Sequence, residues 1–97
     1  MSKPKGIKDV ETADKVFAAL AHPARRQILL SVHYRGVCKA GDIARRFECS
    51  WPTTSRHLST LVDSGLLNVE RSGRERVYSA NAKLLKNLLQ KWSEYFE

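Results

Sequence analysis

The segment from residue 40 to residue 65 constrains the fold more than any other part of the sequence. Ala40–Phe47 and Ser50–Ser64 each carry apolar residues at helical spacing, and only a break at Glu48-Cys49 separates them. Two helices joined by so tight a turn have the spacing of a helix-turn-helix. The apolar residues of this pair are Ile43, Ala44, Phe47, Leu58, Leu61 and Val62.

The second of these segments begins and ends with residues that start and stop helices. Ser50 is a natural N-cap, because its hydroxyl can accept a hydrogen bond from a free backbone N–H in the first turn. Pro52 is tolerated in that turn, where its missing N–H would have had no partner. Gly65 supplies the matching C-terminal stop. We therefore expect a helix over Ser50–Ser64.

Beyond this helix the pattern changes to extended chain. Leu66–Arg71 and Glu75–Ser79 flank a turn at Ser72-Gly73, and this arrangement predicts a β-hairpin. Basic side chains gather around the turn, which would give the hairpin a positively charged tip. These side chains are Arg71, Arg74 and Arg76.

Three further helices complete the expected fold: Glu11–Ala21, Pro23–Tyr34, and a last helix that Asn81 caps and that runs to about Phe96. With 97 residues the chain forms one domain, because two halves could not each bury an adequate core. We expect a flexible N-terminal tail over residues 1–10. Residues 11–97 then form a mainly α winged helix-turn-helix domain with a small β-hairpin, in the order α-α-α-α-β-β-α.

The charge of the chain favours a polyanionic partner. Seventeen Lys and Arg against ten Asp and Glu leave a formal net charge of +7, which points to nucleic acid. No stretch approaches the roughly 20 apolar residues of a membrane span. The polar N-terminus also lacks the apolar core of a secretion signal. We therefore expect a cytoplasmic protein that does not bind membranes.

The outward side of the predicted second helix of the pair suits the major groove of DNA. It is polar and carries Arg56 as its one charge, and a single arginine can contact guanine through two hydrogen bonds. The alternative to a DNA-binding role is that this side is an ordinary solvated helix surface. A basic hairpin tip can likewise serve solubility alone. Helix pair, basic hairpin and net charge together favour DNA binding. This outward side comprises Pro52, Thr53, Arg56, Ser59 and Thr60, flanked by Trp51, Ser55 and His57.

Three stretches resemble the ArsR family of winged helix repressors, and the resemblance covers nearly the whole chain. Leu20–Leu29, LAHPARRQIL, is similar to the opening pattern of the family. Ser50–Leu58, SWPTTSRHL, with the SGL of Ser64–Leu66, resembles its recognition helix. Val69–Tyr78, VERSGRERVY, is similar to its wing, the hairpin beside that helix.

The resemblance implies that the recognition helix approaches DNA and that the wing arginines lie on the DNA backbone. Two residues depart from the family pattern. Trp51 stands where glutamine or another polar residue is common, so it packs on sugar, packs on the helix or reads bases. Lys39 stands where a serine or threonine would cap the helix Ala40–Phe47. The lysine weakens the start of that helix but offers a phosphate contact. The predicted DNA-binding residues are Lys39, Ser50, Trp51, Thr53, Ser55, Arg56, His57, Arg71, Arg74 and Arg76.

The resemblance raises the question whether this chain senses a metal. The ligands that metal-sensing family members use are missing from this sequence. Family members that sense metal use a Cys-x-Cys pair near the third helix or Asp and His ligands on the last helix. Lys39 and Gly41 stand near the positions of the cysteine pair, and the last helix contains no histidine or cysteine. Because a soft-metal site needs three or four ligands, we expect no metal and no cofactor.

The two cysteines do not suit an internal disulfide. An eight-residue helix between Cys38 and Cys49 spans roughly 12 Å, whereas bridged cysteines need Cα atoms within about 7 Å. We expect reduced thiols, with a bridge between subunits or a single oxidisable thiol as the alternative.

The first and last helices display more apolar side chains than the small centre of the domain can cover. Left exposed, these would form an aggregation-prone patch, so we expect the terminal helices to form a homodimer interface. Twofold symmetry would place two recognition helices about one DNA turn apart, and the resemblance implies the same. The alternative is that the apolar stripe belongs to the monomer core. The predicted interface residues are Val16, Phe17, Leu20, Leu85, Leu88, Leu89, Trp92, Tyr95 and Phe96.

The sequence thus predicts a homodimeric repressor that binds an inverted-repeat operator in double-stranded DNA and excludes polymerase. Autoregulation is implied by the resemblance alone. A metal- or thiol-responsive repressor and a winged helix module that binds proteins instead of DNA remain as alternatives. No enzyme is expected, because no nucleophile with a base, phosphate loop or pair of catalytic acids emerges. Asp42 and Asp63 are interpreted as helix-terminus and surface residues.

Overall fold

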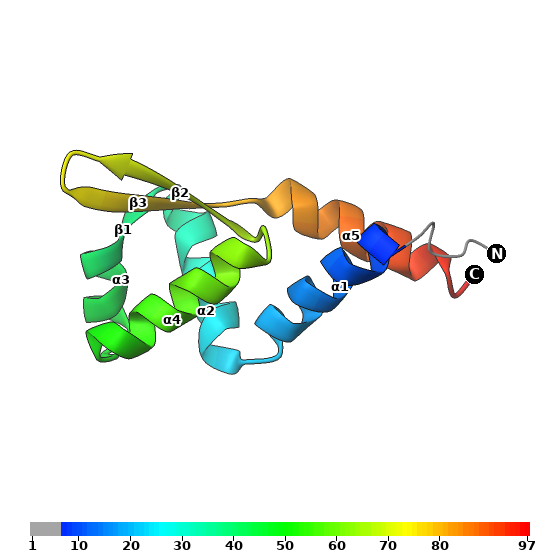
Figure 1. Cartoon of the computed structure of the whole chain (residues 1–97), viewed down its shortest axis with the longest axis horizontal. Helices are drawn as coiled ribbons and strands as arrows, with labels where there is room; N and C mark the ends of the chain where they lie inside the picture. Colours follow the sequence, from blue (N-terminus) through cyan, green and yellow to red (C-terminus); the bar gives the residue numbers. More distant parts are fainter. Residues whose placement is uncertain (1–6) are drawn as a thin grey trace.

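The computed structural model describes residues 7–97 and, for side chains, residues 10–97. Figure 1 shows α2, α3 and α4 gathered against a small sheet at one end of an elongated molecule, with α1 and α5 at the other end. The principal extents are 46 × 24 × 23 Å. The elements in chain order are α1 (Ile7–Leu20), α2 (Pro23–Arg35), β1 (Cys38–Lys39), α3 (Ala40–Arg46), α4 (Trp51–Asp63), β2 (Leu67–Ser72), β3 (Glu75–Ala80) and α5 (Ala82–Glu94).

The first helix begins earlier than the sequence pattern indicated. Because α1 begins at Ile7, residues 7–10 are helical, whereas the sequence pattern placed them in the N-terminal tail and began the helix at Glu11. Val10, Ala13 and Phe17 follow one another at helical spacing, which extends the apolar face of the helix by a turn. The rest of the predicted tail, residues 1–6, lies outside the described residues.

The fold class is confirmed: the chain is mainly helical with a small antiparallel sheet. The sheet contains a strand that was not predicted, since β1 pairs with β3 through Cys38↔Tyr78 and Lys39↔Val77. The strand order is therefore β1-β3-β2. Two residues are too few to show the alternating pattern by which a strand is recognised in a sequence.

The hairpin turn lies one residue later than predicted. Ser72 pairs with Glu75 at the end of the β2–β3 ladder, so Gly73 and Arg74 form the turn. Gly73 has a φ of +61°, a conformation that glycine adopts without steric cost. Arg74 consequently stands at the tip of the hairpin.

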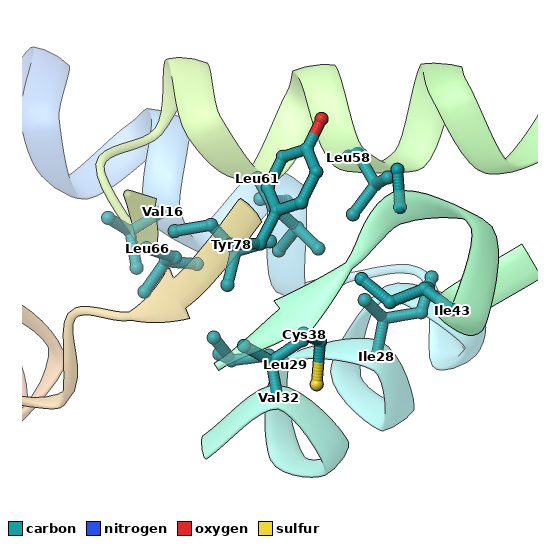
Figure 2. Packing of buried hydrophobic residues seen from close by; sticks show 13 residues of the cluster. Val16, Ile28, Leu29, Val32, Cys38, Ile43, Leu58, Leu61, Leu66 and Tyr78 are labelled. Carbon is teal, nitrogen blue, oxygen red and sulfur yellow. The ribbon is translucent and has the colours of Figure 1, made fainter. Parts of the chain in front are cut away.

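The core lies where α1, α2, α3 and α4 meet the sheet. Leu58 and Leu61 on α4 point toward the strands, and Tyr78 of β3 lies beside them (Figure 2). Cys38 packs among side chains of α2 in the same cluster. This packing fixes the direction in which α4 faces solvent. The buried apolar residues are Val16, Ala19, Ile28, Leu29, Val32, Cys38, Ala40, Ile43, Leu58, Leu61, Leu66, Leu67 and Tyr78.

Side-chain caps define the starts of α4 and α5, as predicted. The Ser50 hydroxyl accepts a hydrogen bond from the Thr53 N–H at 3.4 Å, and the Asn81 side chain accepts one from the Leu84 N–H at 3.2 Å. By contrast, the N-cap of α3 is Lys39, whose side chain makes no capping hydrogen bond. The start of α4 is therefore better anchored than the start of α3.

Gly65 ends α4 for two reasons. Its φ is +87°, and a Cβ at this position would lie 2.9 Å from Leu84 Cδ1. The Leu66 N–H donates to the Leu61 carbonyl at 3.0 Å, which closes the C-terminal turn of the helix. Because α5 packs directly on this turn, only glycine fits without displacing Leu84.

Candidate DNA-binding interface

The second helix of the pair, α4, presents one face to the core and the other to solvent. Thr54, Leu58 and Leu61 are buried, whereas Pro52, Thr53, Arg56 and Ser59 are exposed and Thr60 is half-buried. This division of faces agrees with the helical spacing in the sequence. The exposed side is polar, and Arg56 is its one charged residue. Such a surface can donate and accept hydrogen bonds in a DNA groove without meeting strong electrostatic repulsion.

A cleft of about 610 Å³ separates the start of α4 from the wing, β2 and β3. The start of α3 forms its third side. Trp51, 53% exposed, stands at the edge of this cleft beside the half-buried Ser55. Its basic lining would attract phosphate groups. The basic residues of the lining are Lys39, Arg45, Arg74 and Arg76. The acidic ones are Asp42, which pairs with Arg45, and Glu75, which pairs with Lys39, so the surplus positive charge lies on the wing.

The wing carries its arginines close together. Arg71 and Arg76 are directly opposite each other in the β2–β3 register, and Arg74 occupies the turn. All three are exposed. Like charges placed opposite each other repel, so the arrangement does not stabilise the hairpin. It does concentrate positive charge on the projection that lies beside α4.

Lys39 is engaged with the wing. Its Nζ lies 3.0 Å from Glu75 Oε2, and both side chains are more than half exposed. An exposed pair of this kind contributes about 0 to 1 kcal/mol, so it is easily exchanged for a phosphate. The phosphate contact expected of Lys39 stays a prediction, in which a phosphate would replace Glu75 as the partner of the ammonium group.

His57 lies differently from the prediction. It is only 8% exposed, and its ring centroid lies 4.7 Å from that of His22. Burial lowers the pKa of His57 from 6.5, and the nearby charges of His22, Arg25 and Arg56 lower it further. The free chain therefore buries a residue that was predicted to contact DNA, because His22 at the α1–α2 junction lies against His57.

Arg25 is a neighbour of this face that the sequence pattern did not reveal. Its guanidinium donates hydrogen bonds to the Ala19 carbonyl at 2.8 Å and to the Ala18 carbonyl at 3.0 Å. These bonds give backbone carbonyls in the last turn of α1 a hydrogen-bond partner. The same side chain lines a hollow with Thr53, Arg56 and other residues of α4. Its position in the first turn of α2, after His22-Pro23, was the available signal. What the sequence lacked was the packing of that turn against α4.

Comparison with known proteins identifies the family. A family model described as "Helix-turn-helix domain" matches residues 20–70. The transcriptional repressor SdpR of Bacillus subtilis is 36% identical over 74 residues, covering 76% of this chain and 81% of SdpR. An ArsR-like transcriptional regulator from Rhodococcus sp. RHA1 superposes with a TM-score of 0.82 at 27% identity, covering 92% of this chain and 83% of that one. The chain belongs to the ArsR family.

The family comprises winged helix-turn-helix transcriptional regulators, which are not enzymes, so both predictions are confirmed. A further neighbour shows the same fold at 21% identity, with a TM-score of 0.77 over 100% of this chain and 90% of that one. It is the homodimeric winged helix-turn-helix DNA-binding domain Mb0332 from Mycobacterium bovis.

In this ArsR-family chain the predicted dimer residues do not all reach the surface. Val16 is 0% exposed within the core of its own chain, so its assignment to an interface is wrong. It faces α2 and α4 because α1 packs on both helices. Leu20, Leu85 and Leu88 are partly buried against the same core.

The rest of the predicted interface forms an apolar surface on α1 and α5. The Phe17 ring meets Trp92 edge-on at a centroid distance of 5.3 Å, and Tyr95 is half-buried. Val10, which was not predicted, belongs to the same region because it lines a groove with Trp92 and Tyr95. We call this region the terminal-helix surface. Its exposed large apolar residues are Val10, Leu89, Trp92 and Phe96.

The cysteines of this ArsR-family chain are free thiols. Cys38 is buried in β1, and Cys49 is half-buried after α3 with its Sγ 3.3 Å from the Phe47 carbonyl. In the part of the chain that the structure describes, no three His, Cys, Asp or Glu side chains are grouped so as to hold a metal ion. None of the helices over residues 7–97 has the length and apolar character needed to cross a membrane.

Proposed function

We propose that this chain is a homodimeric repressor that binds an inverted-repeat operator in double-stranded DNA and excludes polymerase from the promoter. Membership of the ArsR family supports DNA-binding transcriptional regulation as the general activity. The observation that carries the more specific proposal is the exposed polar face of α4 beside an arginine-bearing wing. Regulation of its own promoter is part of the proposal, as is a location in the cytoplasm, where bacterial DNA lies.

The two parts of the interface have different tasks in this proposal. Arg56 and the hydroxyl groups of α4 enter the major groove, where an arginine can pair with the O6 and N7 atoms of guanine. Arg74 and its neighbours on the wing meet the sugar-phosphate backbone or the minor groove. The first set therefore provides sequence preference, and the second provides affinity for any duplex.

The homodimer rests on the terminal-helix surface. Leu89 is 47% exposed, Trp92 42% and Phe96 72%, although all three are large and apolar. A second copy would cover them with the same residues, since a twofold interface is self-complementary. The Mycobacterium bovis domain of the same fold is homodimeric, which supports this arrangement. Two recognition helices related by twofold symmetry match an inverted repeat.

The proposal is tested by footprinting the protein on the DNA upstream of its own gene, with Arg56→Ala and Arg74→Ala as a pair of variants. We expect a protected inverted repeat whose affinity falls steeply with salt. Arg56→Ala should reduce the preference for that site by roughly 10- to 100-fold. Arg74→Ala should weaken binding to all duplexes and lower the salt dependence by about one phosphate.

Two outcomes would overturn parts of this proposal. If both variants bind the protected site as the wild type does, the assignment of roles to α4 and the wing is wrong. If the wild type binds no duplex even at low salt, DNA binding itself is wrong, and a protein-interaction module becomes the better interpretation.

A further inference from the structure

Trp51 is a large, mostly apolar side chain held at the surface of a polar and basic region. It is the first residue of α4 and remains 53% exposed, although burying an aromatic ring is ordinarily favourable. Over residues 10–97, the aromatic rings that pack in pairs are those of other residues, and no ring is stacked on Trp51. The fold therefore leaves this ring available for a contact outside the chain.

The surroundings of Trp51 indicate the kind of partner that would cover it. The ring lines the cleft between α4 and the wing, where Arg74 and Arg76 provide positive charge. On α4 its exposed neighbours are Pro52 and Thr53. A phosphate backbone that follows these charges brings the base edges of the major groove to the start of α4, which is where recognition helices read bases.

The chemistry of the indole ring narrows the contact further. Trp has one hydrogen-bond donor, the Nε1–H, and its remaining surface is apolar. Base edges in the major groove present donors and acceptors together with one apolar group, the C5-methyl of thymine. A polar base edge against the ring carbons would lose hydrogen bonds to water, whereas a methyl group loses none.

We propose that Trp51 is a specificity-determining residue, which selects operators by apolar contact with the C5-methyl group of a thymine in the major groove. The inference rests on the proposed function, because it requires duplex binding through α4. It assigns Trp51 a role in base readout instead of packing on sugar. A regulator with glutamine or another polar residue here would read the same base pair through hydrogen bonds.

The test removes the methyl group alone. A duplex selected from a random pool by the wild-type protein is resynthesised with deoxyuridine in place of one thymine at a time, which leaves base pairing intact. We expect the dissociation constant to rise about fourfold at one thymine of each half-site, the factor that corresponds to one buried methyl group. At the remaining thymines the substitution should change binding little.

Three variants then connect the methyl group to Trp51. Trp51→Gln should bind the thymine and deoxyuridine duplexes equally well, whereas Trp51→Phe should keep most of the discrimination because it retains an apolar ring. Tyr34→Ala removes an exposed aromatic side chain outside the cleft and should discriminate as the wild type does. Unchanged circular dichroism and unfolding midpoint show that each variant is folded.

The possible failures are distinguishable. If the wild type binds every deoxyuridine duplex as tightly as the thymine duplex, or if Trp51→Gln retains full discrimination, Trp51 does not read a methyl group. If Trp51→Gln weakens binding to both duplexes equally while the wild type shows no preference, the ring packs on sugar and the inference is wrong. If the wild type binds no duplex at low salt, the proposed function fails as well.

Discussion

The helices α4 and α5 differ in how one chain buries them. Each has 13 residues and begins at a polar residue, Ser50 or Asn81, whose side chain caps the first turn. Yet α4 has four buried residues, whereas α5 has none that is fully buried. The core of a single chain therefore fixes the orientation of α4 but leaves Leu89 and Trp92 of α5 exposed. The helix α5 lies at the end of the molecule away from α3 and the hairpin tip (Figure 1). In the proposed function this difference has a purpose: the helix that contacts DNA is anchored within its own chain, and the helix of the dimer interface is covered by the partner.

Truncation of a buried leucine on α4 tests the first half of this comparison and carries the largest expected effect. Leu61 is fully buried, so Leu61→Ala should lower the free energy of unfolding by about 3 kcal/mol, measured by urea denaturation at fixed protein concentration. Leu30→Ala is the matched control, because Leu30 is exposed on α2. Its change should stay within about 0.5 kcal/mol. A loss below about 1 kcal/mol for Leu61→Ala would contradict the core position.

A charge on α5 tests the second half. Leu89→Glu should give a monomer in sedimentation equilibrium and weaken binding to a two-half-site operator by about 100-fold, because the two recognition helices are no longer linked. Leu30→Glu places the same change at a leucine of similar exposure outside the terminal-helix surface. This control should remain dimeric. A dimeric Leu89→Glu protein would show that the interface lies elsewhere.

Removal of a buried hydroxyl group on α4 should change the free energy of unfolding by a smaller amount and in the stabilising direction. Thr54 Oγ1 is buried, and no hydrogen-bond partner lies within reach among the described residues. Thr54→Val should therefore raise the free energy of unfolding by about 1 kcal/mol, because it removes an unsatisfied polar atom. Thr53→Val is the control, since Thr53 is exposed and its Oγ1 accepts a hydrogen bond from Ser50 at 3.0 Å. Destabilisation by Thr54→Val would mean that the hydroxyl is hydrogen-bonded in solution.

The smallest expected effect concerns pH and the anchoring of α4. Because burial beside His22, Arg25 and Arg56 lowers the pKa of His57, the unfolded chain binds more protons than the folded one just below pH 6.5. The contribution of neutral His57 is complete above that pH and is lost as the pH falls toward the lowered pKa. Urea midpoints between pH 7.5 and 5 should fall less steeply for His57→Gln than for the wild type. Equal slopes would show that His57 titrates freely.

Much of the fold could be predicted because the signals are local. Ser50, Gly65 and Asn81 act on the backbone within a few residues, and the apolar spacing of α4 identified Leu58 and Leu61 as inward-facing. The strand β1 was missed because two residues show no periodicity. The turn at Gly73-Arg74 was placed one residue early, because the ladder register decides which residues remain unpaired.

The candidate site could be predicted only in part. Helical spacing places Arg56 and Thr53 on the outward side of α4, but it gives no distance to other elements. Three contacts of the site join elements far apart in the sequence. They are the burial of His57 beside His22, the ion pair between Lys39 and Glu75, and the approach of Arg25 to α4. Val16 was assigned to the interface although it is buried in its own chain. The spacing of apolar residues on an outer helix is the same whether the core of its own chain or a partner covers them.

The sequence by itself determined the helix-turn-helix, the basic wing and the polar character of the exposed face of α4. Periodicity, caps and charge are properties of short stretches of residues. The tertiary structure alone decided which side chains of that face remain available. It buried His57, paired Lys39 with the wing and left Trp51 exposed beside a basic cleft. The physical reason is that exposure depends on the packing of distant elements, which local spacing does not record.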